Sequence, residues 1–341
     1  MARRTDGRVV VLLGASSGIG RATAVRLARR GDTLVLASRS AEALADVRRE
    51  CLAARPRAHR RSSGAGTGAD GVAGVSAVPT DVSIRSSVEH LFEVTLARHG
   101  RIDAVVFSPA VVAYGHFEEV PAEVFDQVVT TNLLGAANVA RLALQRFKAG
   151  GGGHLVLVGS LLGKISTPFM SSYVTSKWGL HGLARTLQAE LRHTRGVEVS
   201  LVSPGGVNTP IYAQAASYAR REGRPPPPVD PPEKLARAIE RVLDRPRRET
   251  SVGLANHVWT AGFRFMPGVY DAIVAPAMAR VGLSSTRSPE PHTGNVFAPL
   301  PAGEATHGKW GRHWLRNLAV AGAATAAVGT ARAIRVRAPG A

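Results

Sequence analysis

Five aliphatic residues, Val9 to Leu13, lead directly into a turn with three glycines in the seven residues of GASSGIG. The aliphatic run is typical of a buried strand, and IGRATAVRLARR behind the turn has apolar residues at helical spacing. Glycine is needed in such a turn where the backbone takes a positive φ or where a Cβ would block a phosphate. The free N–H groups at the start of the helix then face the anion.

The turn therefore predicts the pyrophosphate site of a dinucleotide in an α/β fold. Its spacing, GxxxGxG, differs from the commoner GxGxxG, so an ordinary strand-to-helix turn is the alternative. The cofactor-binding candidates here are Gly14, Ser16, Ser17, Gly18, Ile19 and Gly20.

A second apolar run, TLVLASR, ends where the adenosine ribose of the cofactor should lie. An acidic side chain there would bind the ribose hydroxyls of NAD, whereas Ser38 and Arg39 offer a hydroxyl and a guanidinium. These groups favour NADP over NAD. The alternative for Arg39 is a solvated arginine in an arginine-rich chain.

The chain has 341 residues, 45% of them hydrophobic, and alternates between strand and helix patterns from Val9 to about Gly253. We predict one dinucleotide-binding and catalytic domain (1–255), a substrate-side extension (256–300) and a basic, Ala/Gly-rich tail (301–341). The single cysteine, Cys51, excludes an intrachain disulfide, and the short apolar run near the N-terminus argues against a signal peptide. Both features favour a cytoplasmic location.

The net charge of +18 is spread over several segments and is not collected on one helix. No basic run is interleaved with aromatic residues and no zinc-ligand spacing occurs, so the pattern argues against nucleic acid as a partner and against a metal site. An apolar stretch at 318–331, between arginines, leaves open a soluble helix, a disordered tail or attachment to a membrane surface. A glycine- and serine-rich segment, Ser62 to Ser76, predicts a mobile insertion.

Tyr173 and Lys177 stand four residues apart in YVTSK, which places them on one face of a helix. The ammonium can then sit near the phenol oxygen and lower the pKa of the tyrosine from its ordinary value of about 10. Such a tyrosine can protonate an alkoxide or accept the proton of an alcohol. Ser160, at the end of a predicted strand, would hydrogen-bond the substrate oxygen. Alone, a YxxxK pair is more typical of an exposed helix face.

Together, these motifs resemble the short-chain dehydrogenase/reductase family over roughly residues 8 to 253. The resemblance implies a Rossmann-like, doubly wound parallel sheet of about seven strands with the site at their carboxyl ends. It also implies a small carbonyl or alcohol substrate, a nicotinamide cofactor and a homo-oligomer. The residues that carry it are GASSGIG (14–20), DV (81–82), Asn132, GS (159–160), YVTSK (173–177) and PGGVNTP (204–210).

The resemblance implies further roles in the site. Lys177 would also bind the nicotinamide ribose, and Asn132 would hold a water that links the lysine to solvent. Asp81 would contact the adenine, although it could instead cap a helix beginning at Ser83. Asn132 could likewise be an amide bonded to a neighbour. The remaining cofactor-binding candidates are Val82, Pro204, Gly205, Val207 and Thr209.

Two positions depart from the family's pattern. Leu13 replaces a threonine before the glycine turn, and Phe107 to Ala110 stand where the family has NNAG. Proline removes a backbone donor, and Ala110 adds a methyl group where glycine allows close approach. We expect an active enzyme with an altered cofactor cradle; the alternative is a nucleotide-sensing or scaffolding protein that keeps the fold without turnover.

Beyond Pro210 the sequence predicts a short lid helix and a cluster of large apolar residues. The cluster could line an apolar pocket for a lipid-like carbonyl, or form a cap helix or an oligomer contact. Its members are Trp259, Phe263, Phe265, Met266, Tyr270 and Met278.

Overall fold

The computed structural model describes residues 7–56, 74–253, 255–287, 290–300 and 303–311. Two predicted features fall wholly or mostly outside them. The apolar stretch at 318–331 is not described, and of the glycine- and serine-rich insertion only residues 74–76 are.

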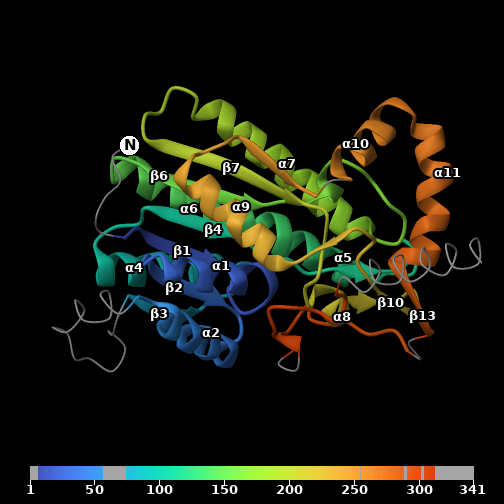
Figure 1. Cartoon of the computed structure of the whole chain (residues 1–341), viewed down its shortest axis with the longest axis horizontal. Helices are drawn as coiled ribbons and strands as arrows, with labels where there is room; N and C mark the ends of the chain where they lie inside the picture. The colour runs from blue at the N-terminus through green and yellow to red at the C-terminus, as the bar shows by residue number, and fades with distance from the viewer. Residues whose placement is uncertain (1–6, 57–73, 254, 288–289, 301–302, 312–341) are drawn as a thin grey trace, which may run out of the picture.

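Seven parallel strands form one sheet with the order β12-β7-β6-β4-β1-β2-β3 (Figure 1). The doubly wound α/β prediction is therefore confirmed. The order of the strands reverses between β1 and β4, and in open α/β sheets ligands bind at the carboxyl ends beside such a reversal. The strands are β1 (Val9–Leu13), β2 (Thr33–Ser38), β3 (Val75–Pro79), β4 (Ala104–Phe107), β6 (Gly153–Val158), β7 (Val197–Pro204) and β12 (Glu249–Val252).

Helices cover both faces of the sheet because the strands bury alternate side chains in two separate cores. In β1, Val10 and Leu12 belong to one core, and Val11 and Leu13 belong to the other. The first core is closed by α1 (Gly18–Arg29), α2 (Ala41–Ala54) and α9 (Pro232–Asp244). The second is closed by α4 (Arg85–His99), α6 (Gly135–Ala149) and α7 (Ser171–Glu190).

The predicted long helical stretch around Asn132 is interrupted. Helix α5 (Ala122–Val129) passes through a π-helical turn, Thr130–Leu134, into α6. The N–H of Gly135 donates to the carbonyl of Thr130, five residues earlier. Single π turns of this kind often occur at functional sites.

Apart from α9 and β12, the chain beyond β7 builds a second layer over the carboxyl ends of the strands. It contains the predicted lid helix α8 (Ile211–Gln214) and a helical hairpin of α10 (Asn256–Phe265) and α11 (Pro267–Ala277), which projects from the body in Figure 1. Within the described residues, no helix is both long and apolar enough to cross a bilayer. Short elements complete the layer: a 3-10 turn Leu161–Gly163, a π turn Met278–Gly282, and the strands β5 (Ala113–Tyr114), β8 (Gly206–Val207), β9 (Ala216–Ser217), β10 (Arg221–Gly223), β11 (Val229–Asp230) and β13 (Leu283–Arg287).

Candidate active site

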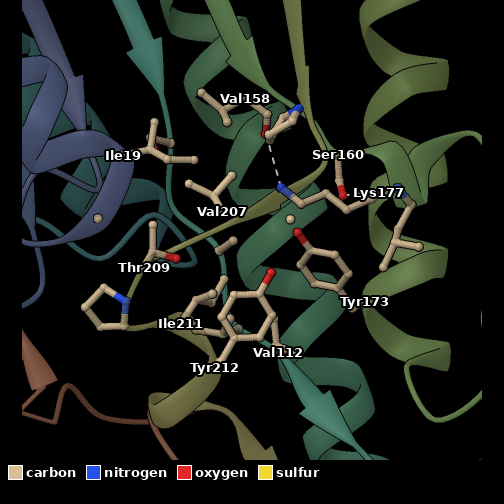
Figure 2. A pocket seen from close by; sticks show the side chains of 18 of the residues that line it. Ile19, Val112, Val158, Ser160, Tyr173, Lys177, Val207, Thr209, Ile211 and Tyr212 are labelled. Carbon is tan, nitrogen blue, oxygen red and sulfur yellow. Dashed lines mark hydrogen bonds between the residues drawn. The ribbon is translucent and has the colours of Figure 1, made fainter. Parts of the chain in front are cut away.

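A cavity of about 450 Å³ lies at the carboxyl ends of the sheet strands (Figure 2). Its wall runs from the glycine turn after β1, past the ends of β4, β6 and β7, to the helical hairpin α10–α11. All the predicted cofactor-binding and catalytic residues except Gly20 and Asn132 line this cavity.

The glycine turn forms a cradle in which side chains could not fit. Gly14 has φ +74°, and a Cβ on it would lie 2.7 Å from the nitrogen of Pro109. Gly18 has φ +52°, and its Cβ would lie 3.1 Å from the side chain of Thr209. A Cβ on Gly20 would overlap the carbonyl oxygen of Gly14, so this glycine lets helix and turn pack closely. The bare backbone at the start of α1 fits a bound pyrophosphate.

The unusual tetrapeptide after β4 packs directly against this turn. The N–H of Ser108 donates to the carbonyl of Leu13 at 3.2 Å, and Pro109 lies beneath Gly14. Ser108, Pro109 and Ala110 all line the cavity. The departure from the family's pattern therefore changes the chemistry of the cavity floor while β1 and β4 keep their pairing.

Three of the four predicted catalytic side chains, Ser160, Tyr173 and Lys177, converge on the cavity (Figure 2). Ser160 follows β6; its hydroxyl accepts the N–H of Leu162 at 3.1 Å, and its side chain is hydrogen-bonded to Tyr173. Lys177 is 1% exposed, and its ammonium donates to the carbonyl of Val158 at 3.1 Å. The lysine nitrogen lies 5.5 Å from the centre of the Tyr173 ring.

Burial controls the proton affinities of this pair. Burial raises the pKa of Tyr173 to about 12, and the hydrogen bond with Ser160 acts in the opposite direction. Burial lowers the pKa of Lys177 to about 8. The expected lowering of the pKa of Tyr173 by the ammonium is thus not found, because the loss of hydration on burial is the largest effect on this group. At neutral pH the phenol is protonated and the amine is charged.

Asn132 lies in the π turn and is fully buried. Its Oδ1 accepts the N–H of Val111 at 2.8 Å, and its Nδ2 donates to the carbonyl of Val111 at 2.9 Å and to Ser176 Oγ at 3.0 Å. Both amide hydrogens are used, as in the alternative that the sequence left open. The side chain ties the loop after β4 to α7, three residues from Tyr173 along the helix.

At the other end of the cavity lie the residues predicted for the adenosine half of the cofactor. Ser38, Arg39, Asp81 and Val82 all line it. The Arg39 guanidinium donates to the carbonyls of Asn295 at 2.6 Å and Val296 at 3.2 Å. Asp81 accepts hydrogen bonds from both the N–H and the hydroxyl of Ser83, so it lines the cavity and also orders the turn before α4. Four further candidates complete the lining, namely Pro204, Gly205, Val207 and Thr209.

The large apolar cluster divides between two locations. Trp259, Tyr270 and Met278 line the cavity, while Phe265 and Met266 are 75% and 56% exposed on the outer side of the hairpin. The Tyr270 hydroxyl donates to the carbonyl of Ser166 at 2.7 Å, which fastens the hairpin over the site. Another aromatic ring also lines the cavity: Tyr212, which the sequence analysis did not single out, lies near Tyr173.

The sequence analysis also missed the segment that closes the adenosine end. Asn295, Leu300 and Glu304 line the cavity beside Ser38 and Arg39. No motif marks these residues, and they follow the glycine turn by more than 270 positions, so the sequence alone does not connect them with it.

Comparison with known proteins agrees with this geometry. The family model of short chain dehydrogenases matches residues 8–219. An uncharacterized oxidoreductase of Bacillus subtilis, YxnA, is 31% identical over 254 residues, which are 74% of this chain and 67% of the relative.

Two solved structures share the fold at moderate identity. An alcohol dehydrogenase of the archaeon Thermococcus sibiricus, complexed with 5-hydroxy-NADP, is 28% identical with a TM-score of 0.59, covering 72% of this chain and 95% of that one. A short chain dehydrogenase/reductase of Burkholderia phymatum, in complex with NAD, is 26% identical with a TM-score of 0.63, covering 76% and 93%. The chain described here therefore belongs to the short-chain dehydrogenase/reductase family and is a nicotinamide-dependent oxidoreductase.

Proposed function

We propose that this protein is an NADP(H)-dependent oxidoreductase that interconverts an apolar carbonyl compound and its secondary alcohol, with Tyr173 as general acid and base. One observation carries the proposal. Ser160, Tyr173 and Lys177 converge on a cavity whose opposite end is the glycine cradle. Hydride transfer requires the catalytic residues and the cofactor-binding turn to face the same cavity.

A nicotinamide cofactor, when bound here, would supply the hydride in reduction and accept it in oxidation. Ser160 and Tyr173 bind the substrate oxygen between their hydroxyls, which are already hydrogen-bonded to each other. In reduction Tyr173 gives its proton to the oxygen as negative charge develops there. In oxidation it takes the proton of the alcohol.

Lys177 holds a positive charge behind the phenol. Its ammonium is buried and donates to the carbonyl of Val158, which keeps the side chain extended along the cavity wall. The charge stabilises the tyrosinate that forms when Tyr173 has given up its proton. The same ammonium would also donate a hydrogen bond to the ribose of the nicotinamide. Asn132 would position α7 through its hydrogen bond with Ser176.

The preference for NADP rests on charge at the end of β2. Ser38 and Arg39 line the adenosine end of the cavity, and β2 ends without an acidic side chain. A guanidinium and a hydroxyl suit a 2′-phosphate, whereas an acidic residue would suit the ribose hydroxyls of NAD. The solved relatives carry NAD or NADP, so they support a nicotinamide cofactor of either kind.

The preference for an apolar substrate rests on the apolar side chains that line the cavity together with Tyr173. Trp259, Val274 and Met278 line it, as do Tyr212 and Tyr270. Such a wall stabilises hydrocarbon by removing it from water and gives polar substrates few partners.

A panel of carbonyl compounds tests the proposal by the loss of NADPH absorbance at 340 nm, with a parallel series in NADH. We expect turnover of long-chain or bulky apolar ketones with NADPH, and weaker turnover of small polar ketones. Cofactor binding without turnover across the panel and its reverse alcohol series would favour the non-catalytic, nucleotide-sensing alternative suggested by Phe107 to Ala110. A preference for polar ketones would remove the apolar-pocket proposal.

A further inference from the structure

The C-terminal segment 303–310 crosses the mouth of the cofactor end of the cavity. The N–H of Gly18, at the start of α1, donates to the carbonyl of Ala305 at 2.9 Å. One turn along the same helix, the Arg21 guanidinium donates to the carbonyl of Glu304 at 2.8 Å. The segment thus binds to the helix end that the glycine turn prepares for an anion.

Beyond residue 305 the same segment is fastened to the loop after β7, to β10 and to α9. The N–H groups of Gly308 and Trp310 donate to the backbone carbonyl and the side-chain Oδ1 of Asn208, at 3.2 Å and 2.9 Å. Lys309 forms an ion pair with Glu222 at 2.7 Å, and the ring of His307 lies 2.7 Å from Glu233. These contacts hold the segment as a strap across the site.

The strap places one carboxylate among the groups that a 2′-phosphate would use. Glu304 is half-buried and lines the cavity beside Ser38 and Arg39. Its side chain is hydrogen-bonded to Ser40 and lies in the field of Arg21 and Arg39. Burial outweighs these partners and raises the pKa of Glu304 above its ordinary value.

Arg39 is also engaged by the C-terminal part of the chain. Its guanidinium donates to the carbonyls of Asn295 and Val296, and its own pKa is lowered by burial. An incoming 2′-phosphate therefore meets an arginine that already has acceptors and a carboxylate that repels it. The 2′-hydroxyl of NAD carries no charge, and a carboxylate can accept its hydrogen bond.

We propose that Glu304 is a cofactor-discriminating residue, whose carboxylate opposes the 2′-phosphate of NADP and does not oppose the uncharged 2′-hydroxyl of NAD. This inference rests on the cofactor site of the proposed function and adds a residue that acts against NADP there. Ser38 and Arg39 attract the phosphate, Glu304 opposes it, and the measured preference is the balance of the two.

Isothermal titration calorimetry tests the proposal on the full chain and the E304Q variant. The ligands are NADPH, NADH and two fragments that differ by the 2′-phosphate, namely 2′,5′-ADP and 5′-AMP. We expect E304Q to bind NADPH and 2′,5′-ADP about tenfold more tightly than the wild type, since one repelling charge is removed from a partly buried site. NADH and 5′-AMP should change by less than about twofold.

E89Q is the matched control, because Glu89 pairs with Arg85 on the exposed side of α4 and does not line the cavity. It should leave all four affinities unchanged. Unchanged or weaker binding of NADPH in E304Q would overturn the proposal, as would equal tightening of NADPH and NADH, which would make the strap a general block. Tighter NADH than NADPH binding in the wild type would instead refute the proposed NADP preference, while the comparison between variants still tests Glu304.

Discussion

The ammonium of Lys177 lies 5.5 Å from the centre of the Tyr173 ring, one helical turn away along α7. Burial moves their pKa values apart, to about 8 for the lysine and about 12 for the tyrosine. At neutral pH the tyrosine is therefore in the protonated form that reduction needs, and it must lose this proton before it can act as the base in oxidation.

Replacing Tyr173 by phenylalanine should lower kcat for carbonyl reduction by roughly 100- to 10,000-fold, the usual contribution of a positioned acid. NADPH binding should persist, because the ring keeps its volume and the glycine cradle is untouched. Steady-state kinetics and calorimetric titration of NADPH measure the two effects separately. Tyr218→Phe is the control, since Tyr218 packs in a different cluster and is absent from the cavity lining. Near-normal turnover by the Tyr173 variant would rule out its proposed role.

The two reaction directions should differ in their dependence on pH. Alcohol oxidation needs the tyrosinate, and the pKa of Tyr173 is raised to about 12, so log(kcat/KM) for oxidation should climb from pH 6 to 9. Above about pH 8 the climb should become shallower, because Lys177 loses its charge near that pH and stabilises the tyrosinate less. Reduction needs the protonated phenol and should stay flat up to about pH 8. A reduction rate that rises with pH would contradict this assignment.

Replacing Arg39 by alanine should weaken NADPH binding by roughly 10- to 100-fold, because a charge-assisted contact with the 2′-phosphate is lost. NADH binding should change by less than about threefold, although the contacts of Arg39 with Asn295 and Val296 are also lost. Calorimetric titration with both cofactors distinguishes the two effects. Arg49→Ala is the control, because Arg49 is an exposed arginine on the neighbouring helix α2. Equal weakening of NADPH and NADH binding would mean that Arg39 supports the loop at Asn295 and Val296 and does not bind the 2′-phosphate.

Much of the fold could be predicted because its signals are local. The aliphatic run Val9–Leu13 and the glycines behind it specify a strand, a turn and a helix within about 20 residues, and the structure forms them. The spacing of Tyr173 and Lys177 likewise places both on one helix face, wherever that helix packs.

The parts that could not be predicted depend on long-range packing. The contact between Arg21 and Glu304 joins residues 283 positions apart, and no sequence pattern connects them. The pKa of Tyr173 was expected to fall, because sequence shows the neighbouring charge and does not show how deeply the ring is buried. Asn132 is a similar case, since its partner Val111 belongs to a loop with no motif of its own.

The protein should lose stability in acid because of two buried histidines. Burial lowers the pKa of both His154 and His181 to about 4, from an ordinary value of 6.5. Between those values the unfolded chain binds more protons than the folded one, so the free energy of unfolding falls as pH decreases from about 6.5 to about 4. Each histidine can contribute about 3 kcal/mol to that loss.

Urea unfolding at pH 7 and pH 4.5 measures the loss, and His154→Gln should reduce it. His154 packs on β6 with its Nε2 2.8 Å from Ser200 Oγ, so glutamine keeps a polar partner there without titrating. His193→Gln, at an exposed position, is the control and should leave the difference between the two pH values as it is. An unchanged difference in the His154 variant would assign the acid sensitivity to other groups.

Adding a methyl group at Gly20 should destabilise the protein, while the same change at Gly182 should not. A Cβ at Gly20 would overlap the carbonyl oxygen of Gly14, and neither backbone can move without opening the turn between β1 and α1. We expect Gly20→Ala to lower the free energy of unfolding by about 2 to 4 kcal/mol, in the range of overpacked core positions. Gly182 lies inside α7 with nothing within 4 Å of its Cβ position, so Gly182→Ala should raise stability by about 0.5 to 1 kcal/mol through helix propensity. Chemical denaturation measures the change in the free energy of unfolding for each variant. A Gly20→Ala protein as stable as the wild type would contradict the predicted overlap with the carbonyl oxygen of Gly14.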